Sequence, residues 1–75
     1  MNRIPLDSTN LKEVGYDPET KTLEIQFRND RIYQYYDVPQ VIFNGLMAIP
    51  DKGFYLRKVI GNAYDYKEIK PNETE

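Results

Sequence analysis

Residues 22–37 read TLEIQFRNDRIYQYYD, and this stretch decides the fold. Apolar and polar side chains alternate along 22–27, which is typical of a strand that buries one face. The apolar members of this strand are Leu23, Ile25 and Phe27. The run 32–37 is rich in β-forming residues, and the polar turn before it predicts a hairpin between the two strands.

The length of the hairpin loop determines where Tyr33 and Tyr35 point. If residues 29–30 form a two-residue turn, both tyrosines point away from the apolar face and stand among polar side chains, as on the stacking surface of RNA-recognition sheets. If residues 28–30 form a three-residue loop, the register shifts by one and both tyrosines join the apolar face. The two registers therefore predict a surface role and a core role for the same residues.

We favour the three-residue loop for two reasons. It places Gln34 in water, whereas the other register would bury this amide at a cost of about 1–3 kcal/mol without partners. It also needs a left-handed residue at the loop end, a conformation that Asp30 tolerates. In this register Ile32 and Tyr36 share the outer face, so they are expected to form an exposed contact patch.

Further elements are predicted on both sides of the hairpin. Residues 14–16 indicate a shorter strand, and 17–20 (DPET) place proline at the second position of a turn. Downstream, apolar residues at helical spacing predict a short helix over 39–48, which begins with proline. A second helix is expected from Asp51, whose side chain can cap it, to Gly61, where it can end.

These elements predict an α+β fold in which a three-stranded antiparallel β-meander is covered on one face by two short helices, a two-layer single domain. We expect the domain to span 7–69, with loosely ordered tails at 1–6 and 70–75. A chain of 75 residues buries only about 60% of its unfolded surface, which gives a marginal core. No length remains for a second domain or a deep interdomain cleft.

Composition narrows the function further. The chain has no cysteine and no histidine, so we expect no disulfide and no zinc site with nitrogen or sulfur ligands. Its carboxylates show neither EF-hand spacing nor a paired catalytic motif, so we also expect no other metal, no cofactor and no catalysis. Its net charge of −2 argues against a basic duplex-DNA footprint but permits stacking of single-stranded RNA on aromatic rings. No apolar run suits a signal peptide or a membrane span, so we expect a cytoplasmic protein, as a monomer or weak dimer.

Several short motifs together resemble a known family. They are Ser8-Thr9, Val14-Gly15-Tyr16-Asp17, Phe27, Tyr33-x-Tyr35, Val38-Pro39, Gly53-x-Tyr55, Ile60 and Tyr64. In this order and spacing the chain is similar to the KTSC domain, found at the C-terminus of some lysyl-tRNA synthetases and in stand-alone bacterial and phage proteins. It departs from that pattern at Asp30, where the family has a turn glycine, and at Leu56-Arg57, where it has an aromatic-Asn pair. The family has no established activity, and the synthetase association implies RNA binding by analogy.

The seven tyrosines are the main compositional anomaly, and with nearby cations they provide the candidate binding surface. Its members are Arg28, Arg31, Tyr33, Tyr35, Tyr36, Arg57 and Lys58. The first hypothesis is a non-catalytic module that binds tRNA or single-stranded RNA through aromatic and arginine contacts. The alternative is a small protein-interaction module or inhibitor that binds a protein partner through the patch of Ile32 and Tyr36.

Overall fold

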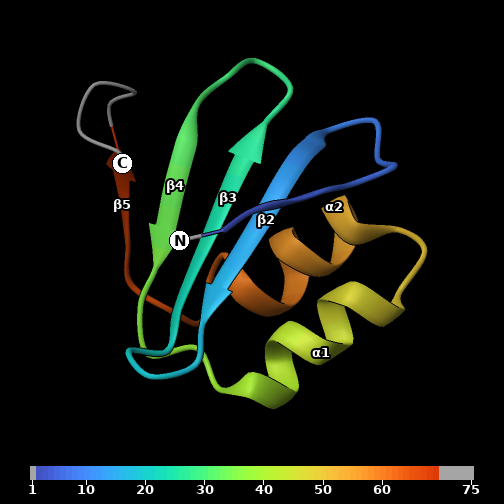
Figure 1. Cartoon of the computed structure of the whole chain (residues 1–75). Coiled ribbons are helices and arrows are strands. Elements are labelled where there is room, and N and C mark those ends of the chain that lie inside the picture. Colours follow the sequence, from blue (N-terminus) through green and yellow to red (C-terminus); the bar gives the residue numbers. More distant parts are fainter. Residues whose placement is uncertain (1, 70–75) are drawn as a thin grey trace.

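A computed structural model describes residues 2–69 as one antiparallel sheet with helices against one face (Figure 1). The strands lie side by side in chain order: β1 (Ile4–Pro5), β2 (Leu11–Asp17), β3 (Thr22–Phe27), β4 (Ile32–Tyr35) and β5 (Tyr66–Ile69). The helical layer contains α1 (Gln40–Ala48) and α2 (Lys52–Tyr55), which continues into the π-helical turn η1 (Leu56–Ile60). The predicted α+β class is confirmed, but the meander has five strands, not three.

The two additional strands lie at the edges of the sheet. At one edge, Ile4 in β1 pairs with Val14, and Leu6 is buried, so the prediction of a loose tail over 1–6 is wrong. The Arg28 guanidinium holds this segment by donating to the backbone carbonyls of Leu6 at 3.0 Å and Ser8 at 3.1 Å. At the other edge, β5 pairs with β4. The tail predicted at 70–75 lies outside the described residues.

The hairpin between β3 and β4 adopts the favoured register. Tyr33 lies opposite Ile25 and Tyr35 opposite Leu23, so both tyrosines share the face of the apolar residues. Asp30 has a φ of 68°, in the left-handed region. The three-residue loop expected from the residue types is therefore confirmed.

The outer face of the hairpin differs from the expectation in one respect. Ile32 is only 3% exposed, so the predicted patch of Ile32 and Tyr36 is wrong. The reason is that β4 is an internal strand, in which Ile32 lies between Gln26 of β3 and Ile69 of β5. Tyr36 is half-buried on this face, and its hydroxyl donates to Gln34 Oε1 at 3.1 Å.

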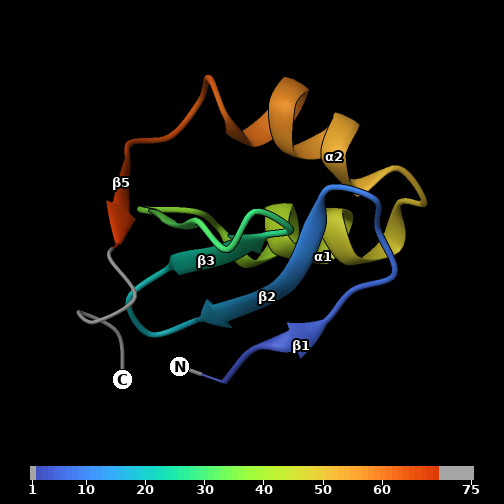
Figure 2. The ribbon, with the colours of Figure 1, turned by 90° about the horizontal axis from the view of Figure 1, so that it is seen from above.

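The N-terminal segment crosses this outer face, opposite the helices, as Figures 1 and 2 show. It brings the Arg3 guanidinium within 3.4 Å of the carboxylates of Glu13 and Glu24. Glu24 is only 6% exposed and also accepts the Gln34 side-chain amide at 2.7 Å. Gln34 is therefore half-buried and hydrogen-bonded to Glu24 and Tyr36, not solvated as expected.

The helices pack on the β2 side of the sheet. α1 follows Pro39 as predicted, and Lys52 closes its end by donating to the carbonyls of Leu46, Met47 and Ile49 at 2.8–3.2 Å. The core between the layers consists of Leu6, Leu11, Val14, Leu23, Ile25, Tyr35, Val38, Leu46, Leu56 and Ile60. In Figure 1 strands β4 and β5 extend beyond the helices, so part of the inner face of the sheet has no helix over it.

Candidate functional site

The uncovered part of the inner face forms a groove with an aromatic lining. It has a volume of about 370 Å³ and is lined by Phe27, Asn29, Arg31, Tyr33, Tyr35, Gly61 and Tyr66. We call it the aromatic groove. It exists because alternate residues of a strand share a face and the helical layer stops short of β4 and β5.

Four rings in this groove contact one another in a continuous row. Phe27 meets Tyr33 edge to face, at 5.5 Å between ring centroids and 89° between planes. Tyr66 lies 5.5 Å from both Tyr33 and Tyr35, tilted by 37° and 38°. Tyr35 is buried under the row, whereas Tyr66 is 56% exposed at its open end. The row therefore offers a partly open aromatic surface, of which Tyr66 is the most exposed ring.

Burial also affects the ionisation of Tyr35. It raises the pKa of Tyr35 to about 12, and the neighbouring hydroxyls of Tyr33 and Tyr66 add to the increase. Desolvation penalises the phenolate, so the Tyr35 side chain stays neutral across the physiological range.

The positive charge of the groove comes from its edge. The side chain of Arg31 is 61% exposed, and its Nη1 lies 3.7 Å from Glu68 Oε1. Asn29 Oδ1 accepts the backbone N–H of Arg31 at 3.0 Å and so holds the loop end against the groove. An exposed ion pair of this kind contributes little to stability, so the guanidinium can exchange partners at small cost.

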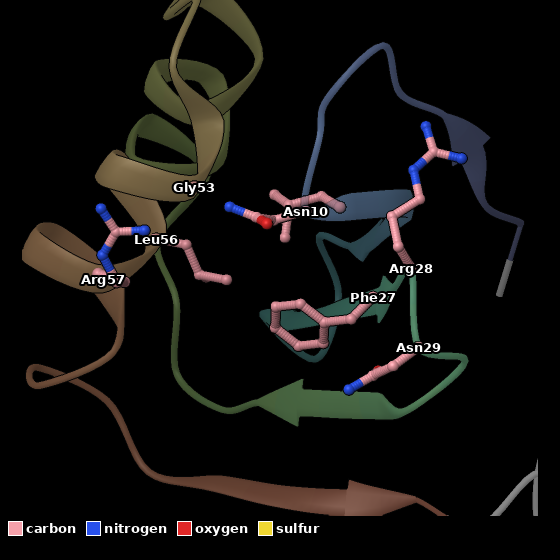
Figure 3. A pocket seen from close by; sticks show the side chains of 8 residues that line it. Asn10, Phe27, Arg28, Asn29, Gly53, Leu56 and Arg57 are labelled. Atoms are coloured by element: carbon pink, nitrogen blue, oxygen red, sulfur yellow. The ribbon is translucent and has the colours of Figure 1, made fainter.

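A second cavity adjoins the groove, and Figure 3 shows its side chains. Its volume is about 400 Å³, and it is lined by Asn10, Leu11, Phe27, Arg28, Asn29, Gly53, Leu56 and Arg57. We call it the arginine cavity. It shares Phe27 and Asn29 with the aromatic groove, so the two hollows lie next to each other.

The candidate residues from the sequence fall into three groups. Arg31, Tyr33 and Tyr35 come together in the aromatic groove. Arg28 and Arg57 line the arginine cavity. The guanidinium of Arg28 is engaged with the N-terminal strap, as described above.

The remaining two candidates lie elsewhere. Lys58 is exposed and lines neither hollow, and Tyr36 lies on the opposite face of the sheet. Sequence reasoning missed Tyr66 and Asn29 as site residues. The alternation of Tyr64, Tyr66 and Glu68 is a weak strand signal that could have pointed to Tyr66.

Residues 2–69 contain neither a candidate metal site nor a helix that could span a membrane. Within this range no group of three or more aspartate, glutamate, cysteine or histidine side chains is placed to hold a metal ion. Over the same residues no helix is long and apolar enough to cross a membrane.

The fold and the groove define a small α+β domain with a half-covered antiparallel sheet. A family model of the KTSC domain matches residues 7–64. The chain belongs to the KTSC domain family, as its motifs suggested.

Individual proteins are similar to this chain in sequence and in structure. The crystal structure of a KTSC domain protein from Yersinia pestis superposes with a TM-score of 0.89 at 35% identity, covering 92% of this chain and 97% of that one. An uncharacterised protein of Stutzerimonas stutzeri is 34% identical over 79% of this chain and 83% of its own length. A lysine–tRNA ligase of Nostoc is 34% identical over 79% of this chain, but the chain spans only 10% of that enzyme.

Proposed function

We propose that this domain is a non-catalytic module that binds single-stranded RNA, including the unpaired regions of tRNA, in the aromatic groove. The observation that carries the proposal is the open row of Phe27, Tyr33 and Tyr66 with Arg31 at its edge. The cytoplasmic location expected from the sequence belongs to the same proposal.

The energetics of the groove suit an unpaired base. Stacking of a base on an aromatic side chain contributes about 1–3 kcal/mol and does not require a particular base. Tyr66 is half-exposed, so it can accept a base without exposing the core. Tyr33 holds Tyr66 in place from below, which limits the ordering cost of binding.

The charge distribution favours single strands over duplex. The chain carries a net charge of −2, so its long-range attraction for a phosphate backbone is weak. Arg31 and Arg57 place two positive charges beside the stacking surface. A module of this kind would derive its affinity mainly from stacking, supported by a few local phosphate contacts. The occurrence of the domain in lysine–tRNA ligases agrees with an RNA ligand.

The decisive comparison uses two tyrosines on opposite faces. Tyr66→Ala removes the exposed ring of the groove, while Tyr36→Ala, the matched control, removes a ring from the outer face. Fluorescence anisotropy with labelled single-stranded oligonucleotides and with tRNA at low salt measures the affinity of each variant. We expect Tyr66→Ala to weaken binding about tenfold, the equivalent of 1.4 kcal/mol, and Tyr36→Ala to leave it unchanged.

Two results would refute the proposal. The first is no binding of the unmodified domain to either RNA at low salt. The second is equal affinity of the Tyr66 and Tyr36 variants, which would place any RNA contact outside the groove. Circular dichroism of both variants establishes that they are folded.

A further inference from the structure

The arginine cavity has an unusual charge for this protein. The chain has twelve acidic residues against ten basic ones, yet the lining of this cavity includes two arginines and two asparagines and no carboxylate. The carboxylate of Asp51 lies outside the lining, where its Oδ1 accepts the N–H of Phe54 at 3.1 Å. The polar side chains that line the cavity thus offer mainly hydrogen-bond donors.

Three of these side chains can direct donors at one ligand. In Figure 3 the amide nitrogens of Asn10 and Asn29 point into the cavity, and Arg57 faces it from the helix on the other side. The orientation of Asn29 is fixed because its Oδ1 accepts the N–H of Arg31, which leaves the NH₂ group toward the cavity. Arg28 points away toward the N-terminal strap, so its guanidinium is not one of these donors.

Gly53 keeps space between the two donors on the helix side. A Cβ at this position would lie 3.2 Å from Asn10 Nδ2, 3.6 Å from Arg57 Nη1 and 3.8 Å from Asp51 Oδ1, the oxygen that accepts the N–H of Phe54. Both nitrogens therefore converge above the glycine. Within residues 2–69 no carboxylate lies within ion-pair distance of Arg57, so its charge is available to a ligand.

We propose that the arginine cavity is a phosphate subsite that binds the phosphodiester next to the base stacked in the aromatic groove. This inference rests on the proposed function and deepens it, because the two hollows share Phe27 and Asn29. A base on Tyr66 and a phosphate at Arg57 would fix the strand across the end of β3. The recognised unit is then a stacked nucleotide with its neighbouring phosphate, not an isolated base.

Backbone-amide NMR can separate the two subsites. The ligands are adenosine, adenosine monophosphate and a short single-stranded oligonucleotide. Both adenosine compounds should shift the amides around Tyr66, and only the phosphorylated one should also shift those of Asn10, Gly53 and Arg57. We expect the monophosphate to bind roughly tenfold more tightly than the nucleoside, since charge-assisted bonds to a phosphate are strong.

Arg57→Gln should remove this difference, whereas the matched control Lys58→Gln, one residue along the same turn, should retain it. For the oligonucleotide, Arg57→Gln should also reduce the slope of log K against log salt by about 0.7, the loss of one phosphate contact to a single strand. Gly53→Ala adds a Cβ between the donors and should weaken phosphate binding. Alanine has a higher helix propensity than glycine, so we do not expect Gly53→Ala to unfold the domain.

The outcomes separate the two claims. If the oligonucleotide binds and depends on Tyr66, but Arg57→Gln behaves like Lys58→Gln, the phosphate subsite is refuted and the proposed function stands. If the monophosphate shifts the amides of Asn10 and Gly53 while Tyr66→Ala has no effect on oligonucleotide binding, the RNA function is refuted and an anion site remains. If no ligand shifts any amide, both are refuted.

Discussion

The contact between the two helices offers a sharp test of the packing. Gly45 of α1 faces the ring of Tyr55. The Tyr55 hydroxyl donates to the carbonyl of Ile42 at 3.1 Å. A Cβ at position 45 would lie 2.9 Å from Tyr55 Cζ and closer still to Oη, where no stable contact exists. Gly45→Ala must therefore displace Tyr55 from its place between the helices.

The expected loss of stability follows from three contributions. Overpacking of a filled interface costs about 1–3 kcal/mol. Loss of the Tyr55 hydrogen bond costs about 1 kcal/mol more. Replacing glycine by alanine inside a helix returns about 1 kcal/mol. We therefore expect Gly45→Ala to lower the free energy of unfolding by about 1–3 kcal/mol, with a fall in Tm of roughly 4–8 °C for each kcal/mol in a domain of this size.

Urea unfolding followed by circular dichroism measures this loss, with Asn44→Ala as the control at an exposed neighbouring position of the same helix. The double variant Gly45→Ala/Tyr55→Phe adds a second criterion, since removing the hydroxyl removes the closest contact. The two substitutions should then be less harmful together than the sum of their separate effects. If Gly45→Ala is as stable as the unmodified chain, or the effects simply add, the steric argument is wrong.

Three further perturbations have defined outcomes. Folding raises the pKa of Tyr35 to about 12, so the neutral hydroxyl contributes stability below pH 10 that is lost as pH rises through the folded pKa. Tyr35→Phe should therefore reduce the loss of stability between about pH 10 and pH 12 by roughly 1–2 kcal/mol, measured by urea unfolding at each pH. Lys52→Met should cost about 1–2 kcal/mol in the same assay at neutral pH, because three carbonyls at the end of α1 lose their donor; a variant as stable as the original would contradict this role. Arg28→Gln should release the N-terminal strap, seen as faster amide hydrogen exchange at Leu6 with unchanged exchange in β3.

The site also explains two of the motif residues by which the family is recognised. Gly53 leaves room for the side chains of Asn10 and Arg57, and Tyr55 two residues later fills the gap beside Gly45. The spacing Gly-x-Tyr thus links the arginine cavity to the packing of the two helices. Arg57, which departs from the family pattern, contributes the cation of the cavity. Its replacement is consequently a test specific to this chain.

Local chemistry determined the parts of the fold that were predicted well. Asp30 tolerates left-handed φ, and this one residue set the loop length and hence the face of Tyr33 and Tyr35. The start of α1 follows from Pro39, and the start of α2 follows from Asp51, whose side chain accepts the N–H of Phe54. Each of these features depends on residues within a few positions of one another, so the sequence contains the necessary information.

Only the tertiary structure decided which surfaces are covered. β1 and β5 are two and four residues long and gain their stability from pairing with other strands, so their local sequence patterns are too weak to predict them. Because β5 adds to β4, Ile32 is buried; because the N-terminal strap crosses the outer face, Glu24 is buried. The candidate site likewise depends on which surfaces other segments cover. The register placed the tyrosines on the apolar face, but the limited extent of the helical layer left part of that face open as the aromatic groove.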